Sequence, residues 1–112
     1  MPKARSDQLQ NTLDLLVLKT LAARGPLHGY AIANHIQQIS DEELRVEEGS
    51  LYPALHRIES EGWIGSEWTT SATNRRVKMY RITVSGRRQL TREEESWARL
   101  SRAIAKVLRF AE

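Results

Sequence analysis

Residues 46–64 read VEEGSLYPALHRIESEGWI, and this stretch predicts a short helix with two different faces. Pro53 is tolerated only near a helix start, where its missing N–H would have had no partner, so we expect the helix to cover about residues 49–61. Gly62 then provides a left-handed stop. At about 100° per residue one face is entirely apolar, with Leu51, Ala54, Leu55 and Ile58. The helix is therefore expected to dock on a core through this face.

The opposite face of the same helix is small and polar. It carries Pro53, His56 and Ser60, with Tyr52 and Arg57 at its sides. This pattern alone is also typical of an ordinary amphipathic surface helix. Whether this polar face is a plain surface or a binding surface depends on the segments around the helix.

Length and composition limit the class of protein. The chain has 112 residues, which is the size of one domain, with 28% charged and 40% hydrophobic residues. No apolar run approaches the length of a membrane span, and the first ten residues lack the apolar core of a secretory signal. The absence of cysteine excludes disulfides, zinc fingers and thiolate metal sensing. We expect a cytoplasmic protein without a membrane partner or a cofactor.

Charge is distributed unevenly along the chain. The formal net charge is only +3, and residues 40–67 carry eight acidic residues against Arg45 and Arg57. Residues 68–92 carry seven basic residues and no acidic one: Arg75, Arg76, Lys78, Arg81, Arg87, Arg88 and Arg92. Because apolar residues alternate with these charges, the block is interpreted as a folded basic patch.

The first predicted helix covers residues 12–23 and is apolar on two sides. One side has Leu13, Val17 and Leu21, and the other has Leu15, Leu18 and Ala22. One core cannot cover both sides in so small a domain, so a partner subunit is expected on one of them. The eleven residues before it are polar, and we expect them to be frayed or ordered only on a partner.

A second helix is predicted over residues 29–40, with Ile32, His35, Ile36 and Ile39 on its core face. Residues 41–48 are acidic, yet the alternation of Leu44 and Val46 is compatible with a short strand. His28 is expected to cap the second helix. A metal site at His28 and His35 is disfavoured, because no third ligand has a useful spacing.

The segments after residue 62 predict a β-hairpin. Residues 63–68 and 76–83 are rich in β-branched and aromatic residues, and the polar residues 69–74 form the turn between them. Trp63 and Trp68 are interpreted as core and hairpin-base packing.

A last helix is predicted over residues 84–110, with Thr83 as its N-cap. Apolar residues recur at heptad positions, and Glu93 is the one departure. These residues are Leu90, Trp97, Leu100, Ile104 and Val107. This pattern is typical of a coiled-coil seam, so we expect a homodimer whose interface includes Leu13, Val17, Leu21, Leu90, Trp97, Leu100, Ile104 and Val107.

The order of elements predicts a mainly α fold with a small β-hairpin. It is a winged helix-turn-helix in residues 1–83, followed by a long coiled-coil-like dimerisation helix in residues 84–112. In this architecture the helix at 49–61 enters the major groove and the wing at 64–83 meets the backbone or the minor groove. The expected DNA-binding residues are Ser50, Tyr52, Pro53, His56, Arg57, Ser60, Asn74, Arg75, Arg76 and Lys78. Arg57 is the one candidate in the helix for a bidentate guanine contact.

Two motifs carry a resemblance to a known family. GPLHGY at 25–30 and EGSLYPAL at 48–55, followed by YRIT at 80–83 and Gly86, resemble the PadR family of bacterial transcriptional regulators. The resemblance implies a winged-helix repressor that dimerises through its first and last helices and binds a palindromic operator in double-stranded DNA. It assigns Tyr52 a phosphate contact. The single C-terminal helix resembles the short branch of the family.

Some members of that family bind flat aromatic compounds between the subunits, and Trp97 lies where such an effector would be sought. Plain dimer packing is the favoured interpretation of Trp97, because a large aromatic at a seam needs no ligand.

A protein-interaction module that docks through the acidic residues 41–48 is the alternative function. An enzyme is disfavoured, since no catalytic triad, carboxylate pair or phosphate-binding loop stands out.

Overall fold

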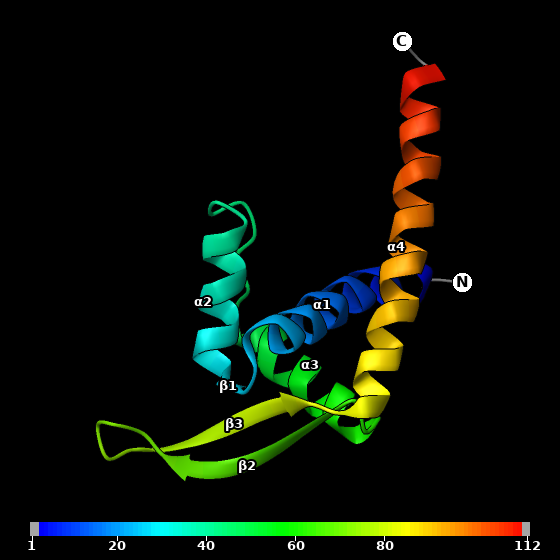
Figure 1. Ribbon diagram of the computed structural model, residues 1–112. Coiled ribbons are helices and arrows are strands. Elements are labelled where there is room, and N and C mark those ends of the chain that lie inside the picture. Colours follow the sequence, from blue (N-terminus) through cyan, green and yellow to red (C-terminus); the bar gives the residue numbers. More distant parts are fainter. Residues whose placement is uncertain (1–2, 111–112) are drawn as a thin grey trace.

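The computed structural model describes the backbone of residues 3–110 and the side chains of residues 12–110 (Figure 1). In chain order the elements are α1 (Lys3–Arg24), β1 (Leu27–His28), α2 (Gly29–Ile39), α3 (Glu48–Ser60), β2 (Ile64–Thr70), β3 (Arg76–Ile82) and α4 (Val84–Phe110). The predicted class, a mainly helical winged helix-turn-helix with a long C-terminal helix, is confirmed. The bounds of α4 coincide with the prediction.

The sheet is antiparallel with strand order β1-β3-β2. Leu27 pairs with Tyr80, and Ile64 pairs with Ile82. The predicted short strand at 41–48 is wrong, and β1 lies before α2 instead. Asp41 and Glu42 both have positive φ, which turns the chain sharply at the end of α2 and leaves the residues after it in an exposed loop.

The first helix begins earlier than predicted, at Lys3 rather than residue 12. Between Pro2 and Gly25 the sequence has no proline or glycine to interrupt a helix. The side chains of Lys3 and Arg5 lie outside the described residues.

The core gathers between α1, α2, α3 and the base of the sheet. Its buried residues are Val17, Leu18, Leu21, Ile32, Ile36, Leu51, Leu55, Ile58, Ile64, Tyr80 and Leu90. The assignment of Val17, Leu21 and Leu90 to a dimer interface is therefore wrong, because they are 0%, 0% and 6% exposed within the single chain. One core does cover both apolar sides of α1, since α2, α3 and α4 contact it from different directions. Ile39 was also misplaced, because it is exposed in the last turn of α2.

Both ends of α3 are set by local geometry. The helix begins at Glu48, so Pro53 lies in its second turn rather than fixing its start. Gly62 has a φ of +80°, and the amides of Gly62 and Trp63 donate to the carbonyls of Glu59 and Ile58. These two bonds form the Schellman motif that glycine favours, so the predicted stop is confirmed.

The start of α4 is held against the base of the wing. Thr83 Oγ1 accepts from the amide of Gly86, as expected of an N-cap. A Cβ on Gly86 would lie 1.9 Å from the carbonyl oxygen of Trp63, so only glycine permits this approach. The C-terminal half of α4 stands clear of the other elements (Figure 1). No helix within residues 3–110 has the length and apolar character needed to cross a membrane.

Candidate nucleic-acid interface

The helix α3 has the two faces that its sequence predicts. Leu51, Ala54, Leu55 and Ile58 are buried. The outward side presents a small polar surface beside one phenol, made of Ser50, Tyr52, Pro53, His56 and Ser60, all of them exposed. Small exposed side chains let a helix approach the floor of a major groove closely.

The wing formed by β2 and β3 projects away from the helices (Figure 1). Asn74, at the tip, has a φ of 61°, and Ser71 N–H donates to the Arg75 carbonyl at 2.7 Å to close the turn. Arg75 and Arg76 are exposed next to this tip. The wing therefore carries these cations to the end of a projection, away from the core.

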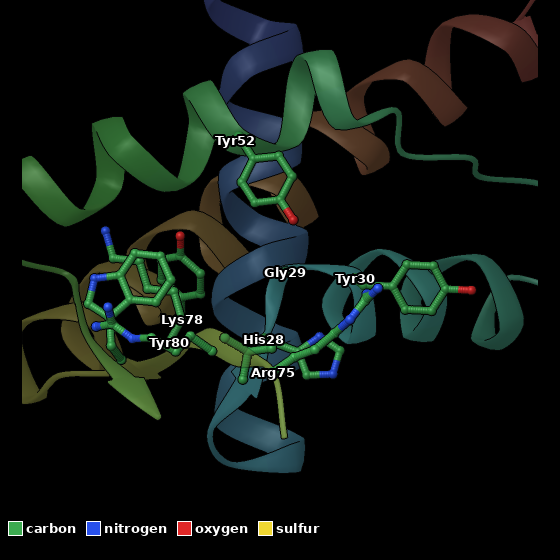
Figure 2. A pocket seen from close by; sticks show the side chains of 10 residues that line it. His28, Gly29, Tyr30, Tyr52, Arg75, Lys78 and Tyr80 are labelled. Atoms are coloured by element: carbon green, nitrogen blue, oxygen red, sulfur yellow. The ribbon is translucent and has the colours of Figure 1, made fainter. Parts of the chain in front are cut away.

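An open groove of about 640 Å³ lies between α3, the start of α2 and the wing (Figure 2). Its lining is aromatic and basic and contains no acidic residue: His28, Gly29, Tyr30, Tyr52, Trp68, Arg75, Arg76, Val77, Lys78 and Tyr80. Burial first, and then the charge of Glu59 and the neighbouring Tyr52, raise the pKa of Tyr80. Its phenol therefore remains neutral at physiological pH. The groove is chemically suited to a polyanion.

The two sequence motifs around Gly29 and Tyr52 meet in this groove. The Tyr52 phenol points from α3 toward Gly29 (Figure 2), and a Cβ built on Gly29 would lie 2.8 Å from the Tyr52 hydroxyl oxygen. A glycine at the start of α2 thus leaves room for the phenol. Tyr52 remains 45% exposed, so its hydroxyl is accessible to a ligand in the groove.

Lys78 lies on β3, two residues from Arg76 toward the base of the wing. Its Nζ is 3.8 Å from Glu59 Oε1, and it also lies over two rings, 5.9 Å from the Trp68 centroid and 5.8 Å from that of Tyr80. Glu59 also accepts a hydrogen bond from Ser66 Oγ. Lys78 therefore links the wing to α3, in addition to the DNA contact predicted for it.

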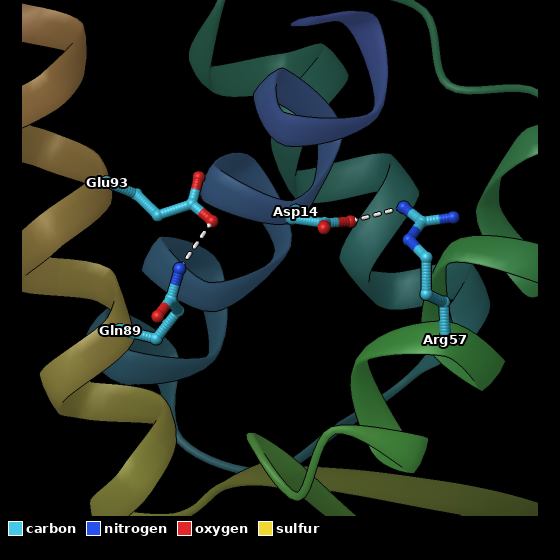
Figure 3. A network of polar contacts seen from close by, with 4 residues as sticks. All are labelled: Asp14, Arg57, Gln89 and Glu93. Carbon is cyan, nitrogen blue, oxygen red and sulfur yellow. Dashed lines mark hydrogen bonds and ion pairs between the residues drawn. The ribbon is translucent and has the colours of Figure 1, made fainter. Parts of the chain in front are cut away.

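Arg57 does not point out from α3 as a base-reading residue would. Its Nη2 donates to Asp14 Oδ1 on α1 at 2.5 Å (Figure 3). Asp14 is only 4% exposed. The pKa of Asp14 lies above its ordinary value, because the effect of burial outweighs the hydrogen bond and charge of Arg57, which lower it. The charge of Glu61 adds to the increase. The expectation that Arg57 is free to read guanine is corrected by this ion pair.

Both histidines near α2 have structural partners. His28 Nδ1 accepts from the amide of Ala31 at 3.3 Å, which confirms the predicted cap. His35 Nδ1 lies 3.1 Å from Arg24 Nη1. Among the described residues, no group of three or more His, Cys, Asp or Glu side chains could hold a metal ion.

The predicted seam residues on α4 differ in their surroundings. Trp97, Leu100, Ile104 and Val107 are 49%, 38%, 47% and 69% exposed, whereas Leu90 is in the core. Leu13, on α1, is half-buried against that core. Residues 97–107 thus carry an apolar stripe that the single chain leaves uncovered.

The sequence interpretation missed Trp68 and Tyr30. Trp68 was assigned to packing, yet it is 58% exposed and lines the groove, as does Tyr30 at 69%. The alternation of β2 and β3 could have placed Trp68, because residues 68 and 78 are opposite each other and therefore share a face. No local signal distinguishes Tyr30, whose position follows from the packing of α2 beside the wing.

Comparison with known families identifies a model that covers most of the domain. The model of the transcriptional regulator PadR-like family matches residues 17–92. Among similar proteins, the transcriptional regulator Rv3488 of Mycobacterium tuberculosis is 35% identical over 83 residues, which cover 74% of each chain. The negative transcriptional regulator PadR of Bacillus subtilis is 30% identical over 70 residues, 62% of this chain and 38% of that one.

Other similar proteins include an uncharacterised 37.1 kDa protein of transposon TN4556 from Streptomyces fradiae. It is 42% identical over 91 residues, which are 81% of this chain and only 24% of that protein. This chain thus spans about a quarter of that relative's length. Among solved structures, a transcriptional regulator from Clostridium thermocellum superposes with a TM-score of 0.80 at 30% identity, covering 89% of this chain and 96% of that one.

Proposed function

The chain belongs to the PadR-like family of transcriptional regulators, and from this premise we propose that it is a homodimeric repressor that binds a palindromic DNA operator. In this proposal residues 1–83 bind DNA and residues 84–112 dimerise. The protein acts in the cytoplasm and needs no cofactor.

The observation that carries the proposal is the acid-free groove between α3 and the wing. Tyr52, Arg75 and Arg76 converge on it from two elements. A phosphate backbone seated in the groove would meet basic side chains on the wing and the phenol on α3, while the exposed face of α3 enters the major groove. Ser50, Pro53, His56 and Ser60 supply that entering face, and Asn74 reaches the duplex from the wing tip.

The distribution of charge supports the same orientation. The acidic loop that includes Asp41, Glu42 and Glu43 lies at the far end of α2 from β1 and the wing (Figure 1). Glu42 Oε1 also accepts from Gln37 on α2 at 2.7 Å, which holds it there. A duplex in the groove is thus kept away from these carboxylates.

Dimerisation through α4 is supported by the uncovered stripe that includes Trp97, Leu100, Ile104 and Val107. A second copy is the simplest cover for apolar residues at heptad spacing. Trp97 then packs at the centre of the interface. A planar aromatic effector inserted there would change Trp97 emission, whereas emission unchanged by a panel of such compounds leaves packing as its sole role.

Repression is proposed because the B. subtilis relative is named a negative transcriptional regulator. A dimer seated on an operator across a promoter blocks access to it without any catalytic step.

Selection of bound sequences from random double-stranded DNA at about 100 mM salt tests the function. We expect an inverted repeat whose half-sites lie about 34 Å apart, because a two-fold dimer presents two copies of α3 to one face of the duplex. Enrichment of no sequence, together with binding of a basic protein by the acidic loop, would instead favour the interaction-module alternative.

A further inference from the structure

Trp68 occupies an unusual position for a tryptophan. It lies on β2, which is an edge strand of the sheet, and its side chain is 58% exposed. An uncovered tryptophan on an edge strand adds little to folding and invites association with other strands. Its exposure therefore points to a surface that binds something.

Two cations gather on the ring of Trp68. Arg76 Cζ lies 5.0 Å from the ring centroid and Lys78 Nζ lies 5.9 Å from it, both within the range of cation–π attraction. The register explains this arrangement, because Trp68 pairs directly with Lys78, and Arg76 is two residues along the same strand on the same face. That face lines the groove opposite Tyr52.

The two cations are also restrained differently. Lys78 has a second anchor in Glu59, while Arg76 is exposed and its guanidinium lies over the ring of Trp68. An arginine side chain gives up considerable rotamer freedom when it is fixed on a phosphate, and a flat ring beneath it limits that freedom in advance. The ring of Trp68 therefore matters more for the orientation of Arg76 than for the orientation of Lys78.

We propose that Trp68 is a DNA-contacting residue of the wing, which positions Arg76 for a backbone phosphate and packs its own exposed ring against the adjoining sugar. This inference rests on the proposed function and adds to it a residue that local pattern had assigned to packing. The chemistry that Trp68 recognises is the sugar–phosphate backbone, so its contribution is independent of base sequence.

Replacement of Trp68 by alanine tests the proposal on the full-length protein and its selected duplex. We expect W68A to bind roughly 5- to 30-fold more weakly, the effect of losing one cation–π contact in each of two wings. The slope of log affinity against log salt should stay within about 1 of the wild-type slope, because the phosphate contacts remain. R76A should instead reduce the slope by about 2 for the dimer.

Thr69→Ala is the matched control, because Thr69 is the next residue on β2, is exposed, and faces the opposite side of the wing. It should bind as the wild type does. W68F should recover part of the loss through its ring, and circular dichroism should show both Trp68 variants folded. A direct contact should also quench Trp68 emission on DNA binding in a protein whose Trp63 and Trp97 are replaced by phenylalanine.

Two failures are distinguishable. Wild-type protein that shows no salt-dependent DNA binding would overturn the proposed function and this inference with it. Wild-type protein that binds DNA while W68A binds equally well, with unquenched Trp68 emission, would overturn the role of Trp68 alone.

Discussion

The ion pair between Asp14 and Arg57 fixes α3 to α1. The carboxylate is almost fully buried, and the guanidinium is 34% exposed. A buried carboxylate is tolerated when a charged donor satisfies it, so the pair holds one rotamer of Arg57 against the domain. Arg57 therefore orients α3 against α1, and its guanidinium is held by Asp14 rather than free to contact a base.

Arg57→Ala should destabilise the protein by about 1–3 kcal/mol, because it leaves the Asp14 carboxylate buried without its donor. Urea unfolding at neutral pH measures this as a lower midpoint with an unchanged slope. His56→Ala, one residue earlier and exposed, is the control and should change stability by less than about 0.5 kcal/mol. Equal midpoints for the two variants would show that the ion pair contributes nothing.

Glu93 is the acidic interruption in the apolar stripe of α4. Its Oε1 accepts from Gln89 Nε2 at 3.1 Å, on the side of α1 opposite Arg57 (Figure 3). The pKa of Glu93 lies above its ordinary value, because the effect of burial outweighs the hydrogen bond from Gln89, which lowers it. The nearby Asp14 carboxylate adds to the increase. A raised pKa in the folded state means that the folded chain keeps its proton to higher pH than the unfolded chain. The free energy of unfolding therefore falls as pH rises through the folded-state pKa.

Glu93→Gln removes this titration while it keeps the hydrogen bond to Gln89. At pH 7 the variant should melt about 2–4 °C above the wild type, the shift expected for roughly 0.5 kcal/mol in a small domain. The difference should vanish below about pH 4, where the glutamate is protonated in both states. Glu95→Gln is the exposed control. A constant difference across the pH range, measured by calorimetry, would contradict the assignment.

The apolar stripe of α4 lies in two different environments. Its first turns are covered by the domain, where Leu90 is buried and Glu94 is paired with Lys19 of α1 at 3.0 Å. The same stripe continues uncovered through Trp97, Leu100 and Ile104. The uncovered part is where a second copy would pack.

Replacing both Leu100 and Ile104 with lysine should convert the protein to a monomer. The lysines of the two subunits would be buried at the dimer interface, where their like charges repel one another and lose their hydration. Sedimentation equilibrium should then give 12.8 kDa rather than twice that mass. Folding should be retained, since both residues are exposed in the single chain. Glu95→Lys, on the opposite side of α4, should leave the dimer intact. A wild-type protein of 12.8 kDa would refute the interface.

Elements marked by local chemistry were predictable from the sequence. The stop of α3 at Gly62, the cap of α4 at Thr83 and the two strands of the wing all depend on residues close in the chain. The exposed face of α3 followed from helical periodicity alone. The groove-lining cations Arg75 and Arg76 followed from an acid-free block of sequence.

Features that depend on distant partners were not predictable. Whether Val17 meets its own core or another subunit depends on where α3 and α4 pack. Arg57 is drawn inward by Asp14, 43 positions away in the chain. The strand β1 exists because Leu27 and His28 meet β3, whereas Leu44 and Val46 have the alternation but lie in a segment that forms no strand.

Two projections, the wing and the free half of α4, extend from one small core. The radius of gyration is 15.6 Å, against about 13 Å for a compact chain of this length. The wing and the free half of α4 account for this elongation (Figure 1). One projection carries cations and aromatic rings, and the other carries an uncovered apolar stripe. This division of surfaces suits a protein that binds DNA through one part and its own copy through another.

The most direct test of the proposed DNA recognition is the salt dependence of binding to the selected duplex between about 50 and 200 mM salt. If about four basic side chains per subunit neutralise phosphates, log affinity should fall against log salt with a slope of about −7 for the dimer. A double Arg75→Ala and Arg76→Ala variant should have a shallower slope on every sequence. A wild-type slope near zero would contradict DNA binding through basic contacts to phosphates.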